Sequence, residues 1–202
     1  MNIAVLGTGH MGTTLAGGLL AAGHTVTFGS RHPEQHTDLA APVVSTVEAI
    51  GSADIVVNAL AASASLQALG PLADELAGKV VLDIGNAVSP DFELLYPDTS
   101  LGERLQQALP AAKVVKSLNT LPGTVTVAPQ SVAEPTSVFL SGDDADAKAL
   151  VGSLLADLGW DAARQIDLGG IETARGVEHY FLLFVAMMQR FRGADFNIRV
   201  VR

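Results

Sequence analysis

The chain has 202 residues, enough for one domain with a sizeable core and short for two. Its formal net charge is −9, so we expect no general binding surface for nucleic acid or for an anionic membrane, because both require a basic face. The absence of cysteine excludes disulfides and thiolate catalysis and fits a reducing compartment. No secretory signal pattern is visible, and we therefore expect a cytoplasmic protein.

The first thirty residues predict a βαβ unit with a glycine-rich turn. We expect a strand at 2–6, a helix at 11–22 and a strand at 24–29. The turn carries a GxGxxG spacing, in which Gly7 suits a tight turn, Gly9 lets the backbone approach a pyrophosphate, and Gly12 allows close packing of helix on strand. This segment therefore predicts a dinucleotide site.

Short apolar runs alternate with helical patterns in the next ninety residues. We expect strands at 42–45, 54–60, 79–84 and 113–118, and helices at 64–77 and 101–109. Continuous apolar strands are typical of parallel sheets that are covered on both faces. The predicted fold class is therefore α/β, a Rossmann-type doubly wound and mostly parallel sheet.

A proline-rich stretch after residue 120 predicts a long loop before order returns. Beyond it we expect strands at 136–141, 161–167 and 196–201, and helices at 144–158, capped by Asp143 or Asp144, and at 171–191. This remainder is too short for the helical substrate domain of many dehydrogenases, so we expect residues 121–202 to extend the sheet of the 1–120 core within a single domain, 1–202. The last helix is apolar on more than one face, which predicts a homodimer.

The residues after the second strand favour NADP over NAD. An NAD site places an acidic residue there to accept hydrogen bonds from the ribose 2′-hydroxyl, and this chain has none. Ser30 and Arg31 stand there instead, with His36 nearby, and a guanidinium with a hydroxyl suits a 2′-phosphate.

Other candidate ligand contacts lie in the glycine turn and at strand ends. The backbone N–H groups of Thr8, His10 and Met11 should face the pyrophosphate. Asn86 and the pair Asn119–Thr120 follow two predicted strands, at the edge where open α/β sheets bind ligands. No metal motif or acid/base set stands at a recognisable spacing, so we name no catalytic or metal-ligating residue.

The segments LGTGHMGTTLAGGLLAAGHTVTFGSR, VVKSLNTLPG, VFLSGDDADAKALVGSLLADLGWDA and DLGGIETARGVEHY resemble, in order, the NADP oxidoreductases that depend on the deazaflavin coenzyme F420. The fold also resembles the cytosolic reductase domain of membrane metalloreductases. The family resemblance implies NADPH across the glycine turn and F420 against its nicotinamide, with direct hydride transfer between two rings.

The resemblance also implies positions for the two coenzymes. Ala59, Leu60 and Ala61 would pass beside the nicotinamide ribose, and Gly123 would leave one nicotinamide face open. Arg175, Glu178 and His179 would lie near the deazaflavin pocket, although an Arg175–Glu178 ion pair on an exposed helix is the structural alternative. Smaller polar residues are usual in the family where His179 stands.

The identity of the hydride acceptor stays open at this point. A flavin in place of F420 would make the protein an NADPH-dependent flavin or ferric reductase. A non-catalytic NADP-binding sensor is the alternative from another class. In each case the expected ligands are small redox coenzymes.

Overall fold

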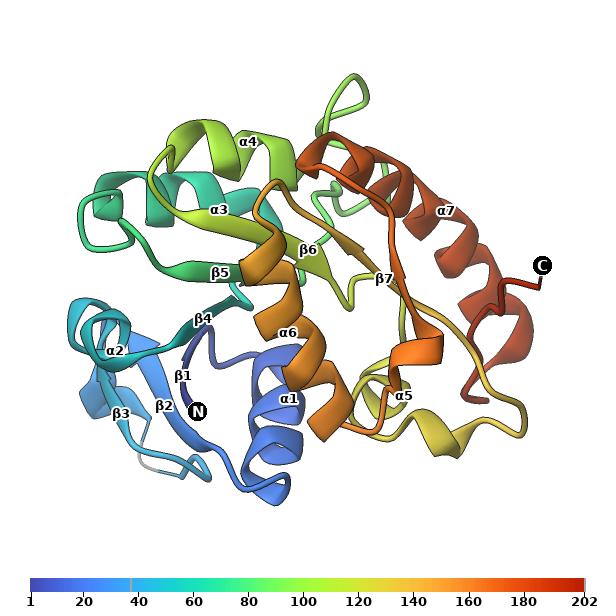
Figure 1. The fold of residues 1–202 in the computed structure, drawn as a ribbon, viewed down its shortest axis with the longest axis horizontal. Helices are drawn as coiled ribbons and strands as arrows, with labels where there is room; N and C mark the ends of the chain where they lie inside the picture. The colour runs from blue at the N-terminus through green and yellow to red at the C-terminus, as the bar shows by residue number, and fades with distance from the viewer. Residues whose placement is uncertain (37, 202) are drawn as a thin grey trace.

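The computed structural model describes residues 1–36 and 38–201, and its centre is a single eight-stranded sheet (Figure 1). The strand order is β3-β2-β1-β4-β5-β6-β7-β8, and neighbouring strands are parallel except β6 and β7. The strands are β1 (Asn2–Leu6), β2 (Thr25–Ser30), β3 (Val43–Ser45), β4 (Ile55–Asn58), β5 (Val80–Asp83), β6 (Lys113–Ser117), β7 (Val138–Ser141) and β8 (Gln165–Asp167). The predicted Rossmann-type fold is confirmed. The order in which strands are added along the sheet reverses between the parallel strands β1 and β4.

Side chains of the central strands alternate between two apolar cores, one on each face of the sheet. In β1, Ile3 and Val5 pack into one core, while Ala4 and Leu6 pack into the other. Strands β4, β5 and β6 repeat the alternation, as expected for a pleated strand that is buried on both sides. This burial explains why the strands appear in the sequence as continuous apolar runs.

Helices cover both faces (Figure 1). The first core holds side chains of α1 (His10–Ala21), α5 (Gly123–Val127) and α6 (Ala145–Asp157). The second holds side chains of α2 (Thr46–Ser52), α3 (Ala62–Leu69), α4 (Leu101–Ala108) and α7 (Ala174–Phe191). Short 3₁₀ turns lie at Pro33–Gln35, Gly70–Leu72, Pro129–Ser131, Ala162–Arg164 and Ile171–Thr173. None of the helices within residues 1–36 and 38–201 has the length and apolar character to cross a membrane.

Helix α2 is an element that the sequence analysis missed. Ser45 accepts a hydrogen bond from the Glu48 N–H at 3.3 Å, which caps the helix. The S-x-x-E spacing is the signature of a capping box, so a local signal for this helix was present. The same spacing at Ser100 and Glu103 begins α4, and Asp144 rather than Asp143 caps α6.

Two predictions for the C-terminal part are wrong. The long loop after residue 120 contains α5, which is anchored where the Trp160 indole donates to the Thr126 carbonyl at 3.0 Å. Residues 196–201 form no strand: the Ser137 N–H donates to the Ile198 carbonyl at 2.9 Å, but the Val200 N–H donates to the Ser137 hydroxyl and does not continue a backbone ladder. The assignment as a single domain, with its division at residue 120, stays a prediction.

Candidate functional site

The glycine turn after β1 has the geometry that its spacing predicts. Gly7 has φ +119°, and a Cβ there would lie 2.3 Å from the Ala59 carbonyl oxygen. A Cβ on Gly12 would lie 2.2 Å from the Gly7 carbonyl oxygen. A Cβ on Gly9 would meet nothing within 4 Å. Gly7 and Gly12 are therefore required by packing, whereas Gly9 leaves open space at the start of α1.

The N-terminus of α1 is suited to an anion. Its N-cap is Gly9, which provides no side-chain hydrogen bond, and its first turn contains no acidic residue. The first N–H groups of a helix lack partners within the helix and carry partial positive charge. By contrast, helices α2, α4 and α6 each have an N-cap side chain that accepts a hydrogen bond from a backbone N–H of the first turn.

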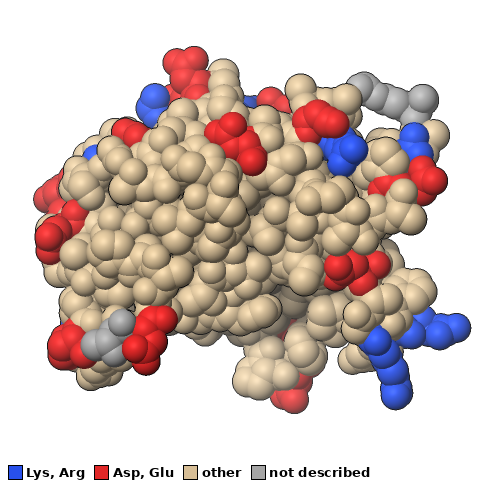
Figure 2. Space-filling view, turned by 90° about the horizontal axis from the view of Figure 1, so that it is seen from below, with Lys and Arg blue, Asp and Glu red and all other residues tan. Residues whose placement is uncertain are grey.

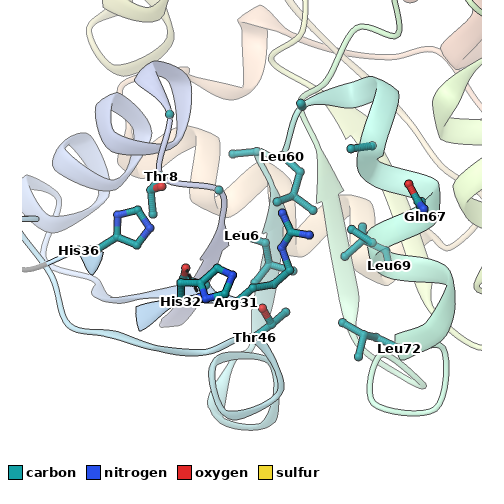
Figure 3. Close-up of a pocket in the computed structure, with 18 of the residues that line it drawn as sticks. Leu6, Thr8, Arg31, His32, His36, Thr46, Leu60, Gln67, Leu69 and Leu72 are labelled. Carbon is teal, nitrogen blue, oxygen red and sulfur yellow. Dashed lines mark hydrogen bonds between the residues drawn. The ribbon is translucent and has the colours of Figure 1, made fainter. Parts of the chain in front are cut away.

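A cavity of about 790 Å³ opens beside this turn, over the ends of β1, β2 and β4 (Figure 3). It contains many of the predicted cofactor contacts, namely Gly7, Thr8, Gly9, Ser30, Arg31, His36, Ala59, Leu60 and Ala61. It spans the point where the strand order changes direction, which is where doubly wound sheets bind dinucleotides.

One side of the cavity is basic in a chain with an acidic balance. Arg31, His32 and His36 line it, and its described lining contains no aspartate or glutamate. The Ser30 hydroxyl accepts a hydrogen bond from the His32 N–H at 3.0 Å, which orders the turn after β2. In Figure 3, Arg31 reaches towards Leu60 across this space. The sequence analysis missed His32, although it directly follows Arg31.

The opposite side of the cavity is an apolar wall that sequence analysis did not assign. It is formed by α3 and the turn after it, through Ala64, Gln67, Ala68, Leu69, Pro71 and Leu72. Apolar surface with a single amide suits a flat aromatic ring, because pockets for such ligands combine apolar walls with few polar groups. The sequence signal was only a helical pattern, which does not show which face lines a cavity.

The remaining predicted residues lie outside this cavity lining but form close groups of their own. A Cβ on Gly123 would lie 3.3 Å from the Met11 Sδ and 3.6 Å from the His10 Nε2. The structure therefore brings the start of α5 against the first turn of α1, to which Gly12 also belongs.

Asn86 and Asn119 form a reciprocal amide pair. Asn86 Nδ2 donates to the Asn119 carbonyl at 2.7 Å, and Asn119 Nδ2 donates to Asn86 Oδ1 at 2.9 Å. Asn119 Nδ2 also lies 3.1 Å from the Val177 carbonyl oxygen, and the neighbouring Thr120 is buried. The ends of β5 and β6 and helix α7 therefore meet at this pair.

The alternative of an Arg175–Glu178 ion pair is wrong. Arg175 pairs with Glu103 at 2.9 Å instead. Burial alone would raise the pKa of Glu103, but hydrogen bonds from Arg175 and Ser100 outweigh it and lower that pKa. Glu178 is 4% exposed, and its carboxylate accepts hydrogen bonds from the N–H groups of Leu101 and Gly102 at the start of α4.

Glu178 also belongs to a buried charge cluster that sequence analysis missed. Lys116 Nζ lies 2.8 Å from Asp83 Oδ2 and 2.8 Å from Glu178 Oε1. Lys116 and Asp83 are fully buried. Each interrupts an otherwise apolar strand pattern at 79–84 or 113–118, and this was the available signal.

Two polar atoms on α7 lack partners. His179 Nε2 and the Tyr180 hydroxyl are buried and have no hydrogen-bond partner among the residues that the structure describes. Burial also raises the pKa of Tyr180. Buried polar atoms are normally paired, so these two unpaired atoms mark α7 as a segment whose polar groups the described chain does not satisfy by itself.

Comparisons with known proteins agree with this geometry. The family model "NADP oxidoreductase coenzyme F420-dependent" matches residues 2–87. The F420-dependent NADP reductase of Methanocaldococcus jannaschii is 27% identical over 224 residues, covering 99% of this chain and 98% of that protein. Metalloreductase STEAP3 of Rattus norvegicus is 30% identical over 179 residues, covering 87% of this chain but 35% of that protein. The crystal structure of a candidate F420-dependent NADP reductase from Arthrobacter sp. FB24 is 38% identical, with a TM-score of 0.93 and 100% coverage of both chains.

Proposed function

The chain belongs to the family of coenzyme F420-dependent NADP oxidoreductases, and we propose that it transfers a hydride between NADP(H) and this deazaflavin coenzyme. The likeness to the M. jannaschii F420-dependent NADP reductase extends over 99% of the chain and supports the acceptor. The open turn at Gly9 lies beside a basic cavity whose lining, among the described residues, contains no aspartate or glutamate. This observation supports the nucleotide and carries the proposal.

The residues of the cavity fit NADP. The uncapped start of α1 would hold the pyrophosphate through its N–H groups. Arg31 would pair with the 2′-phosphate, with His36 and the Ser30 hydroxyl close by. The apolar wall of α3 would lie against the adenine. The residues Ala59, Leu60 and Ala61 would pass beside the ribose at the nicotinamide end.

The residues at the ends of β5 and β6 are proposed for the nicotinamide and acceptor end. When bound, the nicotinamide and the deazaflavin supply the hydride donor and acceptor. The chain's task is to hold the two rings in contact and to exclude water, because direct transfer needs reacting atoms about 3–3.5 Å apart. We assign the contacts with the two rings to the Asn86–Asn119 pair with Thr120, to Gly123, which has no side chain, and to the unpaired His179 Nε2. Arg175 and Glu178 would support these residues indirectly, because Arg175 pairs with Glu103 and Glu178 binds the start of α4.

A flavin or ferric reductase is the second candidate. Its support is the 30% identity with rat metalloreductase STEAP3, of which this chain spans 35%. The two candidates share the NADPH site and differ in the acceptor. The location in the cytoplasm stays a prediction of the sequence.

Anaerobic absorbance spectroscopy tests the proposal. We expect NADPH with the purified protein to bleach F420 faster than FMN at equal concentrations. If NADPH bleached FMN but not F420, the acceptor would be a flavin and not F420. If the protein bound NADPH tightly and bleached neither compound, the proposed oxidoreductase function would be rejected in favour of an NADP-binding sensor.

We also propose that two copies of the chain associate through α7. The helix buries Val177, Phe184 and Val185, yet Leu183 and Phe191 are 55% and 50% exposed. Leu182 and Met188 are exposed as well. Charged residues make up only 16% of the chain, and Figure 2 shows a broad area without acidic or basic side chains on the face seen from below. Exposed apolar groups in such number on one helix are typical of an interface.

Light scattering checks the dimer. We expect a mass of roughly twice 20.9 kDa for the native chain at micromolar concentration, and Leu183→Glu should lower it towards 20.9 kDa, because a buried charge at an interface is not tolerated. Val47→Glu is the matched control, since Val47 is 49% exposed on α2. A native mass of one chain would refute the dimer.

A further inference from the structure

A buried lysine lies at the carboxyl end of β6. Lys116 is fully buried, and its Nζ contacts Asp83 Oδ2, Glu178 Oε1 and the Gly85 carbonyl oxygen. Burial alone would lower the pKa of Lys116, but the carboxylates of Asp83 and Glu178 outweigh it and raise that pKa. The ammonium is therefore charged at neutral pH and has a fixed set of partners.

The two carboxylates extend the network in opposite directions. Asp83 Oδ1 accepts from Asn58 Nδ2 at 2.9 Å, which adds the end of β4. Glu178 accepts from the Leu101 and Gly102 N–H groups at 2.8 and 3.1 Å, which adds the start of α4. The ends of β4, β5 and β6 are thus joined to α4 and α7, and the α4 N-terminus offsets the excess negative charge.

The network fixes the backbone of Gly85, the residue that precedes Asn86. The Gly85 N–H donates to Asp83 Oδ1 at 3.2 Å, and the Gly85 carbonyl accepts from Lys116. Gly85 is thereby held on both sides, directly before Asn86. Asn86 then pairs with Asn119, the residue three positions after Lys116.

The turn between Lys116 and Asn119 is strained. Leu118 is buried with φ +60°, a conformation that costs on the order of 1–3 kcal/mol in a residue other than glycine. The Ser117 hydroxyl donates to the Phe139 carbonyl at 2.6 Å and holds the turn from the β7 side. Such strain persists only where the surroundings over-determine the backbone, and Lys116 and Ser117 supply those restraints.

Fold stability alone does not account for this cluster. Well-packed apolar residues often stabilise a core as much as a buried ion pair does, and the adjacent Val114 and Val115 are apolar. The charges are placed instead at the edge of the sheet where the ligands of such folds bind.

We propose that Lys116 is a positioning residue of the hydride-transfer site, which acts by holding Asn86 and Asn119 against the nicotinamide and acceptor end. This inference rests on the proposed function. In the reaction the hydride leaves the dihydronicotinamide ring of NADPH with both electrons of the C–H bond and forms a C–H bond on the acceptor ring, and a proton from water completes acceptor reduction. Lys116 touches neither ring and affects the rate through their relative placement.

Two variants and a control test this role. Lys116→Met together with Glu178→Gln removes one cation and one anion, so the cluster keeps its net charge. Glu178→Gln alone keeps the Lys116–Asp83 pair and decides the question if the double variant does not fold. Lys148→Met is the control, because Lys148 likewise pairs with a carboxylate, Asp167 at 2.7 Å, and with the Gly169 carbonyl, but on the α6 face of the sheet.

Three measurements are made on each protein: the NADP⁺ dissociation constant, the single-turnover rate of hydride transfer from NADPH to F420, and backbone hydrogen exchange without ligand. For the double variant we expect transfer to slow by on the order of 10- to 100-fold, because a misplacement of about 1 Å has that effect, while NADP⁺ affinity stays within about threefold. For Glu178→Gln we expect a smaller loss in the same direction. Peptides covering 84–88 and 117–123 should exchange about tenfold faster, and those of β1 and α1 should not change.

A folded double variant that transfers hydride within about threefold of the native rate would overturn the inference. Equal losses for Lys148→Met would do the same, since they would indicate general destabilisation. If the native protein reduces neither F420 nor FMN, the proposed function fails, and the exchange data then decide alone: unchanged exchange at 84–88 and 117–123 overturns the positioning role.

Discussion

Gly9→Val is expected to abolish tight binding of NADPH and of NADH while the protein stays folded. A Cβ at Gly9 meets nothing within 4 Å, and the backbone there has φ −76°, which valine adopts without strain. The side chain would occupy the space through which the pyrophosphate approaches the N–H groups of α1. Loss of two charge-assisted hydrogen bonds, at about 1.5–3 kcal/mol each, raises the dissociation constant by about 150-fold or more.

Calorimetric titration and thermal unfolding together check this result. The free energy of unfolding should change by no more than about 1 kcal/mol, because valine is a poorer N-cap than glycine but displaces nothing. Gly12→Ala is the matched contrast, since its Cβ would lie 2.2 Å from the Gly7 carbonyl oxygen and should destabilise the fold by about 1–3 kcal/mol or more. If Gly9→Val bound NADPH as tightly as the native protein, the pyrophosphate would not lie at the start of α1.

Arg31→Ala is expected to weaken NADPH binding by about 10- to 150-fold, the equivalent of one charge-assisted phosphate contact of about 1.5–3 kcal/mol. NADH lacks the 2′-phosphate, so its affinity should change by less than about threefold. Titrations of both nucleotides measure the difference. Arg164→Ala is the control, because Arg164 pairs with Asp161 in a turn outside the cavity lining. If Arg31→Ala lost affinity for NADPH and NADH equally, Arg31 would not be a contact of the 2′-phosphate.

The βαβ unit and its glycine turn could be predicted because their signals are local. A Cβ on Gly12 would meet the Gly7 carbonyl oxygen, and a Cβ on Gly7 would meet the Ala59 carbonyl oxygen just after β4. Both neighbours are backbone atoms, so the need for glycine does not depend on which side chains stand nearby. Arg31 could be placed for the same reason, since it directly follows β2. Helix α2 shows that a local signal can also be overlooked, because the Ser45–Glu48 capping box was present.

The region proposed for the acceptor could be predicted only in part, because its geometry arises from contacts between distant segments. Glu178 and Arg175 stand on one helix, which suggested that they pair, but the fold brings Lys116 to Glu178 and Glu103 to Arg175. The α3 wall posed a similar difficulty, because its helical pattern does not show which face meets the cavity. The tail at 196–201 has a strand-like composition, yet only one backbone hydrogen bond, from the Ser137 N–H to the Ile198 carbonyl, joins it to residue 137, and the side chains of Ser137 and Asn197 make the other contacts.

Isotope transfer is the measurement that tests the central claim most directly. NADPH that carries deuterium at the transferable position of its nicotinamide is mixed with F420 and the native protein in ordinary water, and the reduced coenzyme is analysed by mass spectrometry. Direct transfer between two rings held in contact predicts one deuterium in each reduced F420 molecule. Reduced F420 without deuterium would contradict direct transfer, and the absence of reduced F420 would contradict the proposed activity itself.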